Sequence, residues 1–187
     1  CNDFTLRRGE IVVITGSSMS GKSAFLRTIG VAMALAYAGS VVNAAALTLS
    51  PFRLFTSIRV TDSVVDGISY FYAEVKRLRA LLDALDAADA PPLLFLIDEI
   101  FRGTNNRERL IGSRAYVRAL ARGRGMGLIA THDLELVALA DEIPAVRNLH
   151  FRDDVSDGRM TFDYLLRAGP CPTTNALRIM RLAGLPE

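Results

Sequence analysis

Eight residues near the start of the chain carry the most specific chemical pattern in the sequence. Residues 16–23 read GSSMSGKS, which is the spacing G-x-x-x-x-G-K-S. This spacing is typical of a loop that binds phosphate through backbone N–H groups, aided by the helix that follows. Lys22 is expected to reach the β- and γ-phosphates of a bound nucleotide, and the Ser23 hydroxyl to coordinate Mg²⁺. The predicted cofactor-binding set is completed by Gly16, Ser17, Ser18, Met19, Ser20, Gly21 and Ala24.

The composition of the chain supports this interpretation over an ordinary glycine-rich turn. The chain has twenty arginines and only two lysines, yet a lysine stands at the motif position. A compact ammonium group suits phosphates held in a narrow loop. The loop is also preceded by a short apolar run, as expected between a strand and a helix.

A second pattern combines an apolar run with two acids. Residues 93–97 are apolar and are followed by Asp98 and Glu99, which suits a buried strand that ends at the active site. Asp98 is expected to hold Mg²⁺, and Glu99 to accept a proton from the attacking water. The alternative is a buried strand followed by a solvated acidic turn.

His132 follows another short apolar strand, predicted over residues 128–131. A lone histidine is more often structural than catalytic. This one is predicted beside the phosphate site, in contact with the γ-phosphate or the water, so Lys22, Glu99 and His132 form the predicted catalytic set.

The elements that must position these groups predict an α/β fold. Strands are expected at 10–15, 41–49, 53–60, 93–97, 128–131, 145–151 and 159–166, the last two joined by a turn at 153–158. Helices are expected at 22–38, 69–88, 108–122 and 134–139, with a last helix ending near 183. The central strands are continuously apolar, which predicts a largely parallel sheet flanked by helices, with antiparallel additions.

Length and composition indicate one domain over residues 1–187. Half of the residues are hydrophobic, which argues against disorder, and the net charge of +2 does not point to nucleic acid. Cys1 and Cys171 are too few for a disulfide framework, so a cytoplasmic protein is expected. The start at a cysteine suggests a C-terminal piece of a longer protein.

An uncharged stretch at 28–52 raises the alternative of a membrane span. The stretch is rich in alanine and contains Gly30, Gly39, Ser40 and Asn43, so a buried helix is favoured and no membrane insertion is expected.

Four motifs and the chain's ending resemble the ATPase domain of the MutS mismatch-repair family, a relative of the ABC-type P-loop ATPases. They are GSSMSGKS at 16–23, DGISYFYAEV at 66–75, LFLIDEIFRGT at 94–104, ATHDLEL at 130–136 and TNALRIMRLAGLP at 174–186. The resemblance implies a homodimer with two shared ATP sites, in which Ser69 reaches the partner's γ-phosphate. It also implies that His132 corresponds to the histidine called the switch histidine in that family, and that the Tyr164 ring stacks on adenine. The alternative for Tyr164 is a half-buried hairpin aromatic.

Two departures point to a divergent MutS-related branch. Ser17-Ser18 stand where mismatch-repair members carry Pro-Asn, and residues 105–108 read NNRE instead of a Ser-Thr-x-Asp-Gly-like run. Some members of this branch carry membrane segments ahead of the ATPase, so the full-length protein is a candidate for membrane association. Mismatch recognition does not transfer, since no Phe-x-Glu motif is present, and any DNA contact is expected from regions outside these residues.

The leading hypothesis is therefore Mg²⁺-dependent ATP hydrolysis that drives dimerisation. The alternatives are a nucleotide-gated clamp or scaffold with little hydrolysis and, less favoured, a kinase. Direct DNA binding would use a basic stripe formed by Arg114, Arg118, Arg122 and Arg124, for which a solvated helix face is the simpler explanation.

Overall fold

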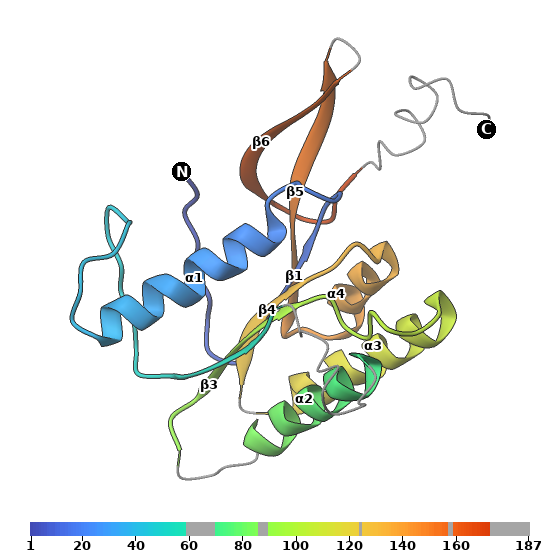
Figure 1. Ribbon diagram of the computed structural model, residues 1–187, viewed down its shortest axis with the longest axis horizontal. Coiled ribbons are helices and arrows are strands. Elements are labelled where there is room, and N and C mark those ends of the chain that lie inside the picture. The colour runs from blue at the N-terminus through green and yellow to red at the C-terminus, as the bar shows by residue number, and fades with distance from the viewer. Residues whose placement is uncertain (59–69, 86–89, 124, 157–158, 173–187) are drawn as a thin grey trace.

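The computed structural model describes residues 1–187 except 59–69, 86–89, 124, 157–158 and 173–187. Its described part contains a six-stranded sheet in the order β2-β3-β4-β1-β5-β6 (Figure 1). All neighbouring pairs are parallel except β5 and β6, which are antiparallel. The predicted α/β fold with a largely parallel sheet and an antiparallel addition is thus confirmed. The strands are β1 (Ile11–Thr15), β2 (Arg53–Ser57), β3 (Leu93–Asp98), β4 (Met126–Ala130), β5 (Val146–Ser156) and β6 (Arg159–Ala168).

Helices cover both faces of this sheet (Figure 1). One face packs against α1 (Lys22–Tyr37), and the other packs against α2 (Tyr70–Leu85) and α3 (Asn106–Arg122). The short helices η2 (Leu134–Ala138) and α4 (Leu139–Glu142) link β4 to β5. Burial on both faces explains why β1, β3 and β4 are apolar at nearly every position.

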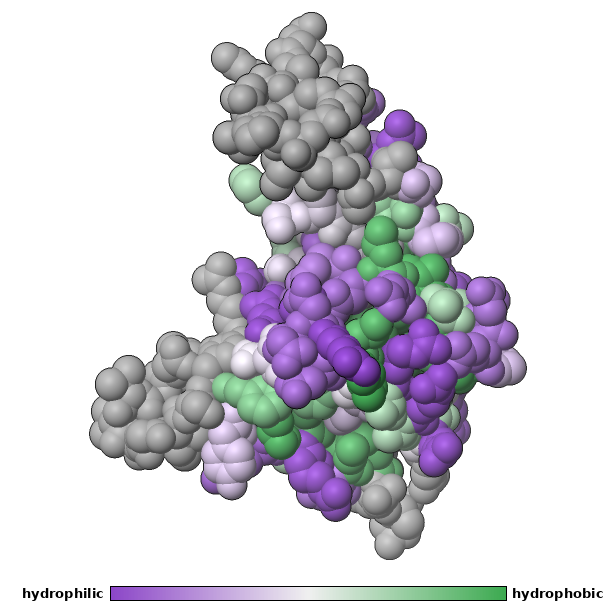
Figure 2. All heavy atoms as spheres, turned by 90° about the vertical axis from the view of Figure 1, so that its right-hand side faces the viewer, coloured by the Kyte–Doolittle hydropathy of each residue, from purple (hydrophilic) through white to green (hydrophobic). Residues whose placement is uncertain are grey.

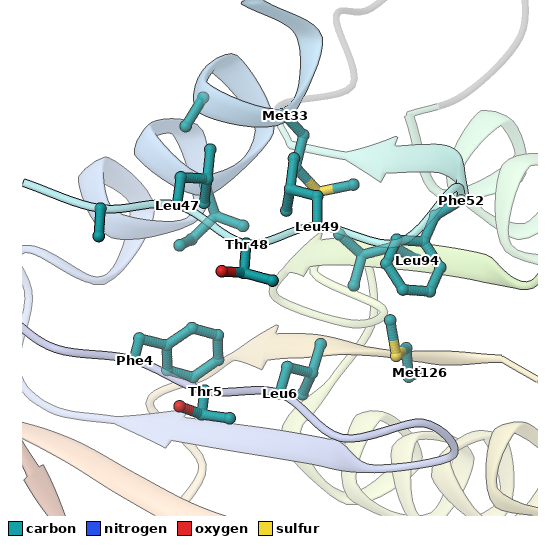
Figure 3. A pocket seen from close by; sticks show the side chains of 13 residues that line it. Phe4, Thr5, Leu6, Met33, Leu47, Thr48, Leu49, Phe52, Leu94 and Met126 are labelled. Atoms are coloured by element: carbon teal, nitrogen blue, oxygen red, sulfur yellow. The ribbon is translucent and has the colours of Figure 1, made fainter. Parts of the chain in front are cut away.

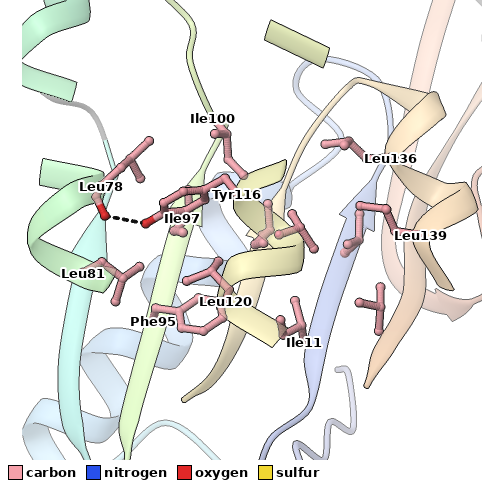
Figure 4. Packing of buried hydrophobic residues seen from close by; sticks show 14 of the residues in the cluster. Ile11, Leu78, Leu81, Phe95, Ile97, Ile100, Tyr116, Leu120, Leu136 and Leu139 are labelled. Carbon is pink, nitrogen blue, oxygen red and sulfur yellow. Dashed lines mark hydrogen bonds between the residues drawn. The ribbon is translucent and has the colours of Figure 1, made fainter. Parts of the chain in front are cut away.

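Alternate residues of each central strand pack into the two hydrophobic clusters, one on each face of the sheet. In β1, Ile11 and Val13 join the cluster on the α2 and α3 side, while Val12 and Ile14 join the cluster on the α1 side. Figure 4 shows the first cluster, where Tyr116 of α3 lies between the strands and α2. Its buried hydroxyl donates a hydrogen bond of 2.7 Å to the carbonyl of Leu78, so α2 and α3 are tied together inside the core.

The structure corrects the prediction of a strand at 41–49, because this segment has no regular secondary structure. The sheet ends at β2 on this side. Leu49 instead packs on the cluster beneath α1, so the apolar residues that suggested a strand bury themselves without joining a ladder.

The hairpin also differs from its prediction, since residues 153–156, expected in the turn, belong to β5. The predicted loop at 61–67, the last helix and Ser69 lie outside the described residues. Among the helices that the structure describes, none has the length and apolar character needed to cross a membrane.

Candidate functional site

The loop between β1 and α1 contains two glycines with positive φ, at which a Cβ would make close contacts. Gly16 has φ +149°, and a Cβ there would lie 2.7 Å from the Ser20 hydroxyl and 2.8 Å from the Phe151 carbonyl. Gly21 has φ +108°, and a Cβ there would lie 3.1 Å from the Tyr164 ring. These glycines therefore allow the loop to turn tightly against β5 and β6.

Lys22 is folded back onto this loop. Its ammonium group donates hydrogen bonds of 2.7 Å to the Gly16 carbonyl and 2.8 Å to the Ser17 carbonyl. Burial lowers the pKa of Lys22, and the nearby carboxylates of Glu99 and Asp98 oppose that shift. An ammonium has three donors, so one remains after the two loop bonds.

Two serine hydroxyls of the same loop have no partner among the described protein atoms. They are the buried Oγ atoms of Ser17 and Ser20. Buried hydroxyls are normally satisfied, so these two are exceptions within the loop. The group that suits a phosphate at the cleft is the Lys22 ammonium, which keeps one donor free.

The sheet order brings the predicted groups to one edge. Strand β4 lies between β3 and β1, and Ala130 at its end pairs with both Asp98 and Ile14. Glu99, Thr131 and the loop after β1 therefore leave the carboxyl ends of adjacent strands, where α/β proteins place their ligands.

A cleft of about 440 Å³ opens between these strand ends and α1. It brings together most of the predicted set, lined by Ser18, Met19, Gly21, Lys22, Ser23, Ala24, Asp98, Glu99 and Tyr164. Arg27 and Arg102 also line it, and sequence reasoning missed both. Gly16, Ser17, Ser20 and His132 are not in the lining.

Tyr164 lies on β6 at this cleft and is 55% exposed. Its backbone has φ +55°, which is uncommon for a bulky residue, and its ring stacks on Phe162 at a centroid distance of 5.9 Å. The ring therefore offers an accessible aromatic surface close to the loop.

A second cavity of about 460 Å³ lies beneath α1, away from these groups (Figure 3). Phe4, Leu6, Met33, Leu49 and Phe52 point into it. Its lining carries no titratable side chain, so the chemistry belongs to the first cleft.

Glu99 is buried and held by two neighbours from the end of β4. The Thr131 hydroxyl lies 3.2 Å from Oε2, and His132 Nδ1 lies 2.9 Å from Oε1. The backbone of Glu99 has φ +69°, and its N–H donates to the Ala130 carbonyl at 2.9 Å. A non-glycine residue in this conformation is strained, which is common at functional sites.

Two further residues complete this network, and no role was predicted for either, although Asp133 lies within the ATHDLEL motif. Arg109 of α3 donates two hydrogen bonds of 2.9 Å to the Asp133 carboxylate, and its Nη2 lies 3.3 Å from His132 Nε2. The hydrogen bond to Asp133 raises the pKa of Arg109. Arg109 and Asp133 are 24 positions apart, so only the fold brings them together.

Glu74 of α2 is a buried carboxylate that faces the loop after Glu99. It is 2% exposed, and its Oε1 lies 3.4 Å from the backbone nitrogen of Arg102. Burial raises the pKa of Glu74, and its Oε2 has no hydrogen-bond partner among the described atoms. This contact links α2 to the loop that carries Arg102, whose Nη2 lies 3.5 Å from Asp98 Oδ2.

Two of the four arginines in the alternative basic stripe form ion pairs. Arg114 and Arg118 each lie 2.5 Å from a carboxylate oxygen of Glu142 on α4, and Arg124 lies outside the described residues. Figure 2 shows hydrophilic and hydrophobic residues together on one face of the molecule. The ion pairs of Arg114 and Arg118 favour the solvated helix face over a DNA-binding stripe.

The two groups predicted to hold Mg²⁺, the Ser23 hydroxyl and the Asp98 carboxylate, belong to residues that line the cleft. The described residues contain no group of three or more His, Cys, Asp and Glu side chains that could hold a metal. Mg²⁺ commonly binds through few protein ligands and takes the rest from water and phosphate, so the pair fits such an ion.

Comparison with known proteins gives the family. Residues 12–187 match the model of MutS domain V. The chain is 38% identical over 189 residues to DNA mismatch repair protein MutS 2 of Halobacterium salinarum, covering 100% of this chain and 21% of that protein. It is 35% identical over 191 residues to DNA mismatch repair protein MutS of Chloroflexus aurantiacus, covering 99% of this chain and 19% of that protein. The chain thus spans about a fifth of these curated relatives, and it belongs to the MutS family, in which it corresponds to domain V.

Proposed function

We propose that this chain is a P-loop ATPase domain of the ABC type that binds and hydrolyses Mg·ATP. The observation that carries the proposal is that Lys22, Ser23, Asp98 and Glu99 line one cleft at the carboxyl edge of the sheet. The segment from Gly16 to Ser23 would hold the phosphates, with Ala24 in the first turn of α1, and Ser23 and Asp98 would hold Mg²⁺.

In this proposal Glu99 accepts the proton of the attacking water, and His132 assists it as its hydrogen-bonded neighbour. Tyr164 stacks on adenine, because its ring is exposed at the cleft. Bound Mg²⁺ would supply charge neutralisation at the phosphates, while the protein supplies position.

We further propose that ATP binding draws two copies together, with Ser69 of each copy completing the site of the other. The names of the relatives suggest that the full-length protein acts in DNA mismatch repair through regions outside this chain. The assignment to a divergent branch and the cytoplasmic location remain predictions.

A binding experiment tests the proposal. Mg·ATP titrated calorimetrically into the protein should bind, and Lys22→Met should weaken binding about tenfold or more because a charged hydrogen bond to phosphate is lost. The other lysine provides the matched control, since Lys76 lies on α2 over the Tyr72 ring. Lys76→Met should bind like the wild type. Equal affinity of the wild type and Lys22→Met would contradict the proposal.

A further inference from the structure

His132 is held between a donor and an acceptor on opposite sides of its ring. Nε2 lies 3.3 Å from Nη2 of Arg109, and Nδ1 lies 2.9 Å from Oε1 of Glu99. A guanidinium group can only donate hydrogen bonds, and an ionised carboxylate can only accept them. The two neighbours therefore restrict where the ring can carry its proton.

Only one state of the ring satisfies both contacts. With the proton on Nδ1, the ring donates to Glu99 and accepts from Arg109. With the proton on Nε2, two donors would face each other at Arg109 and two acceptors at Glu99. In a doubly protonated ring, the Nε2–H donor would face the N–H donors of the Arg109 guanidinium, and the two positive charges would repel each other. Asp133 Oδ1, at 3.8 Å from Nε2, is too far to accept a hydrogen bond from it.

The guanidinium of Arg109 is itself fixed. It forms a two-bond fork with the carboxylate of Asp133, and the side chains of the pair are only 12% and 17% exposed. Such bidentate pairs are geometrically specific as well as strong. Asp133 is also fixed at its backbone, whose N–H donates to the Thr131 hydroxyl at 3.0 Å.

We propose that Arg109 and Asp133 are positioning residues that hold His132 as the neutral Nδ1–H tautomer donating to Glu99. The only ring N–H is then directed at Glu99, and His132 acts on the reaction through that carboxylate. Each oxygen of Glu99 keeps a second lone pair with which to accept a water. The inference about the tautomer stands on the geometry, and only its effect on turnover rests on the proposed ATP hydrolysis.

The tautomer can be measured without nucleotide. The chain has two histidines, so ¹⁵N-histidine labelling and long-range ¹H–¹⁵N spectra give two ring patterns, which His132→Gln assigns. His150 is an internal reference, since its Nδ1 lies 3.0 Å from the Gly169 carbonyl and must be protonated to bond there. We expect His132 to have Nδ1 protonated, as His150 does, and Nε2 unprotonated.

Removal of the guanidinium should release the ring. Arg109→Met is expected to move the His132 signals toward a mixture of tautomers, while Arg107→Met, a change of an exposed residue on the same helix, should leave them in place. In ATP hydrolysis, Arg109→Met should lower kcat about tenfold or more with little change in KM, because a misoriented catalytic group slows chemistry more than binding. Arg109→Lys, which keeps a donor, should restore part of the rate.

The outcomes separate the two proposals. A wild-type His132 with a protonated Nε2, or a pattern unchanged by Arg109→Met, would overturn the positioning role. An Nδ1–H pattern that depends on Arg109 supports it, even in a protein that failed to hydrolyse ATP. The wild-type spectrum alone decides the tautomer if a variant does not fold.

Discussion

The ring of Tyr164 packs against the loop glycine Gly21, with its Cδ1 3.1 Å from where a Cβ at Gly21 would lie. This contact joins the antiparallel hairpin to the predicted phosphate loop, although the two are far apart in the sequence. An exposed ring fixed beside the loop is well placed to stack on a base whose phosphates the loop holds.

Tyr164→Ala should therefore weaken Mg·ATP binding by about 1–3 kcal/mol, the usual worth of stacking on one base, and Tyr164→Phe should keep most of the affinity. Fluorescence or calorimetric titration measures this. Inorganic tripolyphosphate, which has no base, is the control and should bind all three proteins equally. A loss with tripolyphosphate as large as the loss with ATP would show that Tyr164 shapes the loop and does not stack on adenine.

Gly16→Ala should damage the loop itself. The added Cβ would lie within 2.8 Å of both the Ser20 hydroxyl and the Phe151 carbonyl, so the loop must shift, at a cost of about 1–3 kcal/mol in the free energy of unfolding. We expect a lower Tm and weakened Mg·ATP binding.

Gly39→Ala is the matched control for that change. Gly39 also has a positive φ, +70°, but a Cβ there meets nothing within 4 Å. It should lose stability through backbone strain and keep its affinity for Mg·ATP. Equal loss of binding in both variants would mean that general instability, and not loop geometry, explains the effect.

Glu74 predicts a pH dependence of stability. Burial raises the pKa of Glu74 above its ordinary value of 4.5 in the folded protein. The folded state therefore binds this proton more tightly than the unfolded state, and the stability it contributes is present below 4.5 and lost as pH rises through the raised pKa. Glu74→Gln removes this titration while keeping an oxygen for the Arg102 N–H.

Urea unfolding of the wild type and Glu74→Gln between about pH 4 and pH 8 measures the difference. The wild type should lose stability relative to the variant as pH rises across the lower part of this range, and the difference should then level off. A difference that is flat in pH, or that changes in the opposite direction, would contradict the burial of an ionisable Glu74.

The sequence predicted well those strands and helices whose formation follows from a local pattern of residues. Strands β1, β3 and β4 are continuous apolar runs because both faces are covered, and α1 follows directly from the loop motif. The segment 41–49 is similarly apolar, yet it forms no strand, and Leu49 packs on the hydrophobic cluster beside α1. A strand needs a partner strand to pair with, and the sequence alone does not show whether one is available.

The candidate site also contains residues that local patterns predict and residues that only the fold brings together. The loop motif and the acidic pair are local patterns, and the sheet order brings them to one cleft. Glu74 and Asp133 lie inside quoted motifs and Arg109 lies outside them, but no role was predicted for any of the three. Their roles in the network arise from contacts across 24 to 28 positions, which only the packing of α2 and α3 against the sheet creates.

The most direct test of the account is a single-turnover measurement of ATP hydrolysis by the wild type and Glu99→Gln. With Mg²⁺ present and the protein in excess over radiolabelled ATP, the wild type should convert bound ATP to ADP and phosphate. Glu99→Gln should bind ATP with similar affinity and hydrolyse it about 10²–10⁴-fold more slowly, since it lacks the general base. Hydrolysis at the wild-type rate by Glu99→Gln would remove Glu99 from that role, and ATP binding without hydrolysis by the wild type would make the chain a nucleotide-gated clamp.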